Sequence, residues 1–374
     1  MALEDCVELC TRILDEAQLG IAGALIRRDG LVVFPTETVY GLGANALSET
    51  AVAGIFRAKG RPQDNPLIVH VASLSQITEV ADSVNDIARV LIENLMPGPL
   101  TVILPRAAGL ARGVTAGKDT VGLRIPGSEL ARRFLAEAGV PVAAPSANQS
   151  GRPSPTSFAM ALAEMDGRVD AVIRGPDATV GLESTIVWPQ DERTVHLLRP
   201  GGIDALALRG VLDRNGMGAA RLLFNGQEIG AAVPRNHGRV SPISAGSAGS
   251  GGENSVPFEL PAAPGTRYRH YSPKAMVRLF SDRADLQALL AAGAAGDAPA
   301  GGGGVALIGA ELCPGYQPPA GLGGDWSVAY RSAFVSLDDY AHHLYRELVE
   351  ADHRGNAVVP VSYTHLAGDS QMTL

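Results

Sequence analysis

The chain has 374 residues, of which 46% are hydrophobic and 19% charged, and its formal net charge is −8. This length suggests two or three domains, and the composition excludes wholesale disorder and binding of nucleic acid by bulk positive charge. The chain has no run of about 18 apolar residues and its N-terminus is acidic, so we expect a cytoplasmic protein that does not contact membranes. The three cysteines, Cys6, Cys10 and Cys313, predict neither a disulfide framework nor a zinc site.

Helical and extended patterns alternate over the first 210 residues. Apolar residues at helical spacing predict a helix over 3–19. Ser48 is a good N-cap for a helix that ends at Gly60. The predicted strands are 31–34, 67–71, 100–104, 121–125 and 140–144, and the predicted helices after the first are 49–59, 84–95 and 127–138. This alternation indicates an α/β sheet domain.

The second half of the chain changes in composition. Residues 234–264 are rich in Gly, Pro and Ser, which is typical of a flexible linker. A second α/β pattern follows, with strands over 276–280, 305–308 and 357–361 and helices over 282–291 and 337–350. We therefore predict a catalytic domain at 1–215, a linker at 216–274 and a smaller domain at 275–374.

A first polar cluster comes directly after the predicted strand 31–34. Residues 34–45 combine hydroxyls, a carboxylate and glycines, which suits a ligand held over the end of a sheet or, alternatively, a hairpin with a polar surface. Gly41, Gly43 and Ala46 formally fit a dinucleotide fingerprint, but Pro35 interrupts the approach and the helix cap comes only at Ser48.

A second cluster, Arg57, Lys59 and Arg61, lies at the end of the predicted helix 49–59. These cations could simply complement the negative end of the helix dipole. However, Gly60 and Pro62 force a turn that should bring Lys59 and Arg61 out together, and such a pair suits a polyphosphate.

A third cluster, residues 145–154, carries small hydroxyl and amide groups that could either cradle a nucleotide or form an ordinary loop. His70 is either a ligand or a satisfied histidine at a strand end. Arg124 ends a strand, where a buried guanidinium requires a carboxylate partner. The chain contains no nucleophile elbow around Ser146, no zinc-type spacing and no P-loop.

Taken in this order, the clusters resemble the YrdC/Sua5 family of threonylcarbamoyl-adenylate synthases. The segments that carry the resemblance are 34–45, 59–62, 65–70, 97–101, 124–126, 144–148, 183–186 and 198–201, with Pro264, Gly265 and 269–271 matching the junction to the extra domain of the long form. The chain's ending, residues 361–374, departs from the basic, Gly-rich tail of the family.

The resemblance implies a YrdC-like twisted mixed sheet with helices around a concave basic cavity, plus a smaller Rossmann-like α/β C-terminal domain. It implies a nucleotidyltransferase that makes threonylcarbamoyl-AMP and pyrophosphate from L-threonine, bicarbonate and ATP with Mg²⁺, for the t6A37 modification of tRNA. The implied threonine-binding residues are Thr38, His70, Arg124, Ala144 and Ser184. The implied ATP-binding residues are Arg61, Asn65, Thr120, Ser146, Asn148, Ser154, Arg199 and Tyr271.

The residue chemistry agrees with this assignment. Arg124 supplies a fixed cation for a carboxylate, and Lys59 and Arg61 supply the charge that stabilises an adenylyl transfer, which needs no protein nucleophile. We expect Tyr271 and the linker to close over the adenylate, and the product to pass to the tRNA threonylcarbamoyl transferase machinery; a weak direct contact with RNA stays open. Two alternatives are a carbamoyl-adenylate-forming domain of the hydrogenase-maturation type and a non-catalytic RNA-binding module.

Overall fold

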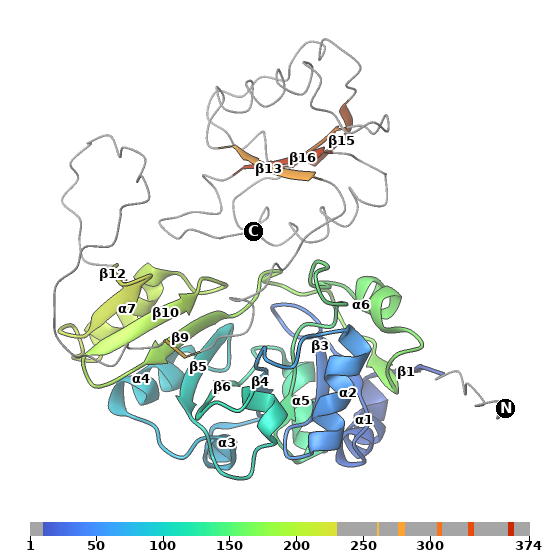
Figure 1. Cartoon of the computed structure of the whole chain (residues 1–374), viewed down its shortest axis with the longest axis horizontal. Helices are drawn as coiled ribbons and strands as arrows, with labels where there is room; N and C mark the ends of the chain where they lie inside the picture. Colours follow the sequence, from blue (N-terminus) through green and yellow to red (C-terminus); the bar gives the residue numbers. More distant parts are fainter. Residues whose placement is uncertain are drawn as a thin grey trace.

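The computed structural model describes residues 10–229, 260–261, 276–280, 305–308, 328–332 and 358–362. Residues 10–229 form a mixed sheet of twelve strands with helices packed on it (Figure 1). The strand order is β1-β8-β2-β3-β7-β4-β6-β5-β9-β10-β11-β12. Parallel and antiparallel pairs are combined in this sheet: β4 pairs with β6 in parallel and with β7 in antiparallel fashion.

The strands of the large sheet are short. They are β1 (Arg12–Leu14), β2 (Val32–Phe34), β3 (Gly41–Asn45), β4 (Ile68–His70), β5 (Leu100–Pro105), β6 (Thr120–Arg124), β7 (Val142–Ala143), β8 (Ala171–Ile173), β9 (Thr185–Pro189), β10 (Thr194–Arg199), β11 (Arg221–Phe224) and β12 (Gln227–Glu228). The helices are α1 (Leu19–Arg27), α2 (Glu49–Lys59), α3 (Ile77–Val80), α4 (Asp86–Leu95), α5 (Glu129–Ala138), α6 (Phe158–Met165) and α7 (Ala205–Arg214), with 3-10 turns at Glu16–Gln18, Leu74–Gln76 and Arg112–Thr115.

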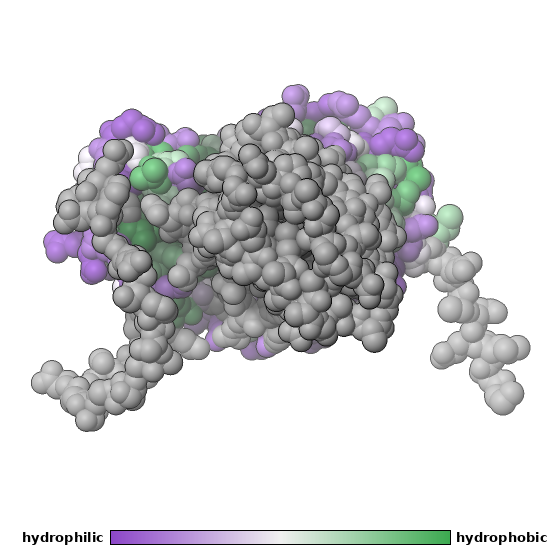
Figure 2. Space-filling model, turned by 90° about the horizontal axis from the view of Figure 1, so that it is seen from above, coloured by the Kyte–Doolittle hydropathy of each residue, from purple (hydrophilic) through white to green (hydrophobic). Residues whose placement is uncertain are grey.

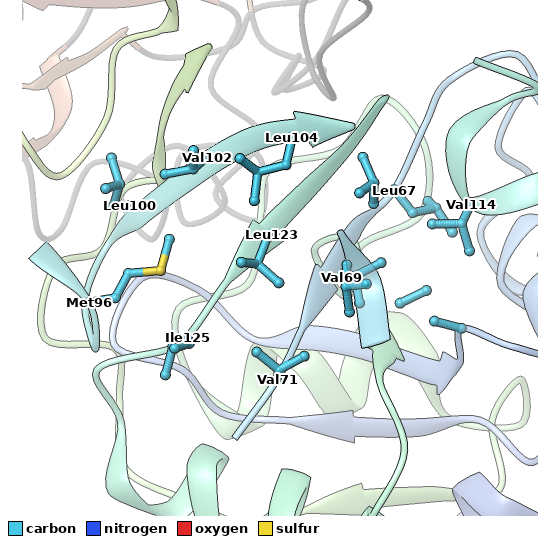
Figure 3. Close-up of a cluster of buried hydrophobic side chains, with 14 of the residues drawn as sticks. Leu67, Val69, Val71, Met96, Leu100, Val102, Leu104, Val114, Leu123 and Ile125 are labelled. Carbon is cyan, nitrogen blue, oxygen red and sulfur yellow. The ribbon is translucent and has the colours of Figure 1, made fainter. Parts of the chain in front are cut away.

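The largest hydrophobic core lies on one face of the sheet, under α2, α4, α6 and α7. Alternate residues of the central strands point into it, because side chains alternate between the faces of a sheet. Val69 of β4, Val102 of β5 and Leu123 of β6 meet in this core together with Met96 and Ile125 (Figure 3). The second face therefore receives the residues between them, among which are Ile68 and His70.

A second core covers part of that other face. Helices α1 and α5 pack on each other and on β2, with Phe34 and Phe134 in contact at a ring-centroid distance of 5.0 Å. Gly23 permits the close approach of the two helices, since a Cβ there would lie 2.4 Å from the carbonyl oxygen of Glu137. The helices on this face stop short of β4, β6 and β5.

Beyond α1 and α5, a third cluster on this face is built from strand residues. Ile68, Ile103 and Ile186 are buried together, with Trp188 and Leu198 partly buried against them. Among the described residues no helical side chain belongs to this cluster. The sheet is thus open over its central strands, next to the N-terminal end of α5, and this opening is where the polar clusters of the sequence gather.

Most of the predicted elements of this part of the chain are confirmed. Ser48 caps α2 through a bond from the Ala51 N–H, and Gly60 ends the helix with a φ of +60°. The predicted strands and helices between residues 31 and 144 are all present within two residues at each end, with β7 the shortest. Ser128 caps α5 and Gly139 ends it in the left-handed conformation.

The prediction of one helix over 3–19 is wrong for the residues that the structure describes. Residues 12–14 form β1, which pairs in parallel with β8 and buries Leu14. Asp15 then caps a 3-10 turn, and the helix α1 begins only at Leu19. The helical spacing of Leu14 and Ala17 was misleading, because pairing with β8, about 160 residues later, determines the conformation.

A separate sheet of four strands lies in the C-terminal part. Its strands are β13 (Met276–Phe280), β14 (Val305–Ile308), β15 (Val328–Ser332) and β16 (Val358–Ser362), in the order β13-β16-β14-β15, and all pairs are parallel. Three of these strands were predicted and β15 was missed. The predicted helices 282–291 and 337–350 and the linker 234–264 lie outside the described residues, except for 260–261.

Figure 2 shows both hydrophilic residues and apolar patches on the part of the surface that belongs to described residues. No helix of the described part is both long and apolar enough to cross a membrane.

Candidate active site

The polar clusters of the sequence meet in one pocket on the open face of the sheet. Its floor is formed by residues with small or apolar side chains from three neighbouring strands: Gly41 of β3, Ile68 of β4 and Ala144 after β7. Polar groups surround this floor. The lining is completed by Thr36, Val39, Arg61, His70, Arg124, Pro145, Ser146, Glu183, Ser184 and Arg199.

The two ends of the pocket lie along strand β4. Ile68 and His70 point to the same face and lie about 7 Å apart along the strand. His70 pairs in register with Arg124 of β6, which places the guanidinium at one end. Arg61 precedes β4 and lies at the other end, where Ala144 donates its N–H to the Ile68 carbonyl at 2.8 Å. Arg61 and Arg124 therefore face one pocket from opposite ends.

Arg124 is 4% exposed and is held by a carboxylate, as the sequence predicts. Its Nη2 lies 2.7 Å from Oε1 of Glu37, whose other oxygen accepts the N–H of Ser128 at 3.2 Å. Burial by itself raises the pKa of Glu37, but the Arg124 charge and the Gly127 N–H outweigh it, so the pKa of this carboxyl is below its ordinary value. The Nε atom of Arg124 has no hydrogen-bond partner among the described residues.

His70 is fully enclosed next to Arg124. Burial and the Arg124 charge lower the pKa of this imidazole to about 3, so the ring is neutral at pH 7. Its edge packs on Phe34 with ring centroids 6.0 Å apart. Nδ1 has no hydrogen-bond partner in the described part of the chain. A neutral ring with an unpaired nitrogen is suited to a hydrogen bond with a polar ligand rather than to holding an anion.

Thr36 and Thr38 lie in a tight turn between β2 and β3. The Thr36 hydroxyl donates to the Val39 carbonyl at 2.6 Å, accepts the N–H of Thr38 at 3.2 Å and lies 2.9 Å from the Thr38 hydroxyl. Thr36 lines the pocket, whereas Thr38, the predicted ligand, lies behind it and is fully buried. The turn therefore places Thr36 in the pocket wall, while the Thr36 hydroxyl is hydrogen-bonded within the turn.

Ser184 and Arg199 form a hydrogen-bonded network on the third side of the pocket. Arg199 donates to the Ser184 carbonyl at 2.8 Å and to its hydroxyl at 3.1 Å, and that hydroxyl lies 2.7 Å from the hydroxyl of Thr101. Glu183 accepts the Ser154 hydroxyl at 2.7 Å and lies 3.5 Å from Arg199. Ser154 thus reaches the pocket only through Glu183.

The close packing of Gly201 keeps this network in place. A Cβ at Gly201 would lie 2.4 Å from the Glu183 carbonyl oxygen and 2.5 Å from the Thr185 nitrogen. We predict that Gly201→Ala lowers the free energy of unfolding by about 1–3 kcal/mol, because backbone has to move, and lowers activity by displacing Ser184. Thermal and urea unfolding measure the first effect.

Gly109→Ala is the matched control, since a Cβ there meets nothing within 4 Å. A change of about 0.5 kcal/mol or less is expected for it. If the two variants unfolded alike, the packing role of Gly201 would be refuted.

Arg61 lines the end of the pocket opposite Arg124, and Asn65, which is not in the lining, accepts a bond from the Arg61 Nε atom at its carbonyl at 3.5 Å. Asn65 is 1% exposed, and both polar atoms of its amide lack hydrogen-bond partners among the described residues. Such a buried amide is rare without a ligand, because leaving it unpaired costs about 1–3 kcal/mol. Arg61 is half-buried and donates to the Pro66 carbonyl at 3.0 Å.

Lys59 does not come out beside Arg61, and that expectation is wrong. The side chain is 3% exposed and its ammonium donates to the carbonyls of Ser146 and Asn148, with the Asn148 Oδ1 atom at 3.4 Å. The Asn148 amide in turn donates to the Arg152 carbonyl at 2.7 Å. Lys59 and Asn148 therefore shape the loop that presents Ser146, instead of lining the pocket.

The burial of Lys59 predicts a pH-dependent stability. Burial and the neighbouring Arg61 lower the pKa of this ammonium from 10.5 to about 7, against the opposing charges of Glu183 and Glu164. Between these values the unfolded chain binds a proton that the folded chain does not, so the free energy of unfolding rises with pH by about 1.4 kcal/mol per unit.

The difference between wild type and Lys59→Met, measured by urea unfolding from pH 7 to 10, should show this slope. Parallel pH curves for the two proteins would contradict it.

Six predicted site residues that the structure describes do not line the pocket: Thr38, Lys59, Asn65, Thr120, Asn148 and Ser154. Thr120 begins β6, at the opposite end of the strand from Arg124, about 13 Å away and on the same face. Tyr271 lies outside the described residues. Four polar residues that were not predicted as site residues also line or support the pocket. These are Thr36, Glu37, Thr101 and Glu183.

Among the described residues, no three His, Cys, Asp or Glu side chains come together in a way that could hold a metal ion. Glu183 is the carboxylate in the lining of the pocket.

Comparison with known families assigns both parts of the chain. The family model described as "Telomere recombination" (Sua5_yciO_yrdC) matches residues 24–201, and the model described as "Threonylcarbamoyl-AMP synthase, C-terminal domain" matches residues 230–370.

Curated relatives share more than a third of their aligned residues with this chain. Threonylcarbamoyl-AMP synthase of Pyrococcus abyssi is 39% identical over 268 residues, which are 71% of this chain and 68% of that protein. The enzyme of the same name from Bacillus subtilis is 39% identical over 262 residues, 70% of this chain and 66% of that protein.

Solved structures agree with these relatives. The crystal structure of P. abyssi Sua5 complexed with L-threonine superposes with a TM-score of 0.72 at 34% identity, covering 94% of this chain and 92% of that one. A variant of the same P. abyssi protein with two alanine substitutions gives a TM-score of 0.73 at 32% identity, covering 94% and 91%.

Proposed function

The chain belongs to the Sua5 family of threonylcarbamoyl-AMP synthases, and we propose that the pocket over β4 is where it joins L-threonine, bicarbonate and ATP. The enzyme makes threonylcarbamoyl-AMP for the t6A modification of tRNA. One observation supports this location above the others. Arg124 and Arg61 face a single pocket from its two ends, His70 with its unpaired Nδ1 lines the same pocket, and the amide of Asn65, likewise unpaired among the described residues, lies four residues after Arg61.

Threonine binds at the Arg124 end. Its carboxylate accepts hydrogen bonds from the guanidinium, whose Nε still lacks a partner among the described residues. Its hydroxyl meets the small polar groups of Thr36 and Ser184, with Thr38 behind, and Nδ1 of His70 bonds a further polar group of the amino acid. The Ala144 backbone adds the wall that limits the size of the side chain.

ATP binds at the Arg61 end. Arg61 holds the triphosphate, the Asn65 amide and the Ser146 hydroxyl bond the nucleotide, and Arg199 adds a second cation from the side of Ser184. Thr120 lies further along the same open face, and Asn148 and Ser154 support the site through Lys59 and Glu183. Tyr271 is assigned to ATP by the family pattern alone.

The reaction needs positioning and charge, and no protein nucleophile. The threonine amine attacks bicarbonate carbon and releases water, which gives the N-carboxylate. An oxygen of this N-carboxylate then attacks the α-phosphorus of ATP, and the bond between the α-phosphorus and the pyrophosphate oxygen breaks. Arg61 stabilises the charge that develops on the leaving phosphates. Because Arg124 and Arg61 line the same pocket, the two substrates bind within reach of each other.

Mg²⁺ fits this pocket as an ion carried by the nucleotide. Mg²⁺ prefers oxygen ligands, keeps several waters and is commonly bound by one or two carboxylates plus phosphates, so Glu183 and the triphosphate suffice. When bound, the ion neutralises phosphate charge. The C-terminal sheet of parallel strands is consistent with a Rossmann-like domain. We place the enzyme in the cytoplasm and expect it to pass its product to the tRNA threonylcarbamoyl transferase machinery.

Pyrophosphate release with single amino acids tests the proposal. The purified chain is given ATP, Mg²⁺, bicarbonate and one amino acid at a time, and the adenylate is identified by mass spectrometry. Release that depends on both threonine and bicarbonate is the predicted result. Dependence on carbamoyl phosphate would support the hydrogenase-maturation alternative, and absence of turnover together with tight RNA binding would support a binding module.

A further inference from the structure

The carboxylate of Glu37 lies behind the pocket and does not line it, yet it holds the guanidinium that does. The Arg124–Glu37 pair is almost completely enclosed, with side-chain exposures of 5% and 10%. The contact is made through Nη2 of Arg124. Because Glu37 occupies this part of the guanidinium, the unpaired Nε is left for a ligand.

Glu37 is itself held on several sides. Its Oε2 accepts the Ser128 N–H at the start of α5, and the positive end of that helix favours a carboxylate. Its carbonyl accepts the Val180 N–H at 2.7 Å. Gly127 packs so closely that a Cβ there would lie 3.2 Å from the carboxyl carbon of Glu37. The position of this side chain is therefore fixed from both the backbone and the carboxylate.

The neighbours of Glu37 in the sequence are the two threonines of the β2–β3 turn. Thr36 lines the pocket, and its hydroxyl donates to the Val39 carbonyl and lies 2.9 Å from the Thr38 hydroxyl. One short turn thus carries both Thr36, which forms part of the pocket wall, and the carboxylate that fixes Arg124. This turn therefore sets the position of the Arg124 guanidinium relative to the pocket wall at Thr36.

We propose that Glu37 is a positioning residue that holds Arg124 at a fixed distance from the pocket wall at Thr36 and so sets how tightly and how selectively the pocket binds threonine. The proposal rests on the proposed function, since it takes threonine as the ligand. Its basis is geometric. The Glu37 carboxylate is bonded to the Arg124 guanidinium, and the preceding residue, Thr36, lines the pocket.

A double-mutant cycle tests whether Glu37 acts through Arg124. The variants are Glu37→Gln, Arg124→Gln and both together. In the wild-type background Glu37→Gln should raise KM for threonine about 10- to 100-fold and leave KM for ATP within about threefold. In the Arg124→Gln background the same substitution should change KM for threonine less than about threefold. Additive effects, or an equal rise in both KM values, would overturn the proposal.

Glu37→Asp separates position from charge. It keeps the negative charge but shortens the side chain by one methylene, so the Arg124 guanidinium should shift. We expect a loss of at least about tenfold in kcat/KM for threonine and a lower preference for threonine over alanine and 2-aminobutyrate. Full recovery of wild-type kinetics by Asp would show that charge alone matters and would overturn the positioning role. This variant also carries the test if Glu37→Gln does not fold.

Asp170→Asn is the matched control. Asp170 also accepts a backbone N–H, that of Leu31 at 2.7 Å, but it does not line the proposed pocket. The KM values of Asp170→Asn should equal those of the wild type.

Calorimetric titration with L-threonine repeats the double-mutant cycle as a binding measurement, without turnover. A wild type that binds threonine but makes no adenylate would refute the proposed function, whereas a wild type that is active but shows no coupling would refute the role of Glu37.

Discussion

Arg124→Gln should lower kcat/KM for threonine by at least about 30-fold, while KM for ATP changes little. The side chain is buried, and a neutral amide at this position cannot form the charge-assisted bonds to a carboxylate. Truncating one member of a buried, hydrogen-bonded charge pair costs about 2–5 kcal/mol in binding, which corresponds to a factor of roughly 30 to several thousand. Pyrophosphate release at varied threonine concentration measures this effect.

Arg133→Gln is the control for Arg124→Gln. Arg133 lies on α5, close in the sequence, and forms an exposed ion pair with Glu16. Because exposed pairs contribute little, its kinetics and its stability should stay near those of the wild type. An unchanged KM for threonine in the Arg124 variant would show that the amino acid binds elsewhere.

Arg61→Ala should act on the other substrate. We expect kcat to fall by about 10²- to 10³-fold, because one group that stabilises developing charge is lost, and KM for ATP to rise. Threonine affinity, measured by calorimetry without ATP, should stay unchanged. The two arginine variants would then affect different substrates, which is expected if each arginine binds one of them.

Arg57→Ala controls for the loss of a cation at the end of α2. Arg57 is exposed, four residues before Arg61, and it lies outside the proposed pocket. The Arg57→Ala variant should retain near-normal turnover. If Arg57→Ala and Arg61→Ala lowered turnover equally, a general effect of charge near the nucleotide would replace the specific contact. Near-normal turnover with an unchanged ATP affinity in Arg61→Ala would contradict the assignment.

Local signals were sufficient to predict the elements that carry their own start and stop residues. Helix α2 follows from Ser48 and Gly60, and α5 from Ser128 and Gly139, because caps act within a few residues. The N-terminal strand β1 could not be predicted in this way. Its conformation depends on β8, and no pattern within residues 12–14 contains that information.

The same distinction applies to the site. The carboxylate partner of Arg124 was predicted in kind, since a buried guanidinium needs one, but not in identity, because Glu37 comes 87 residues earlier. Lys59 was misplaced because its neighbours, Gly60 and Pro62, indicate only a turn and not its direction. The loop 146–148 that binds the Lys59 ammonium follows β7, and only the sheet order brings it under α2.

The most direct test of the central claim is a crystal structure of the full chain with L-threonine, bicarbonate and a non-hydrolysable ATP analogue. The prediction is that the threonine carboxylate bonds Arg124, the triphosphate bonds Arg61, and the amino group and the α-phosphorus share the space over Ile68 and His70. Threonine and nucleotide bound in separate cavities, or threonine bound without contact to Arg124, would contradict the account.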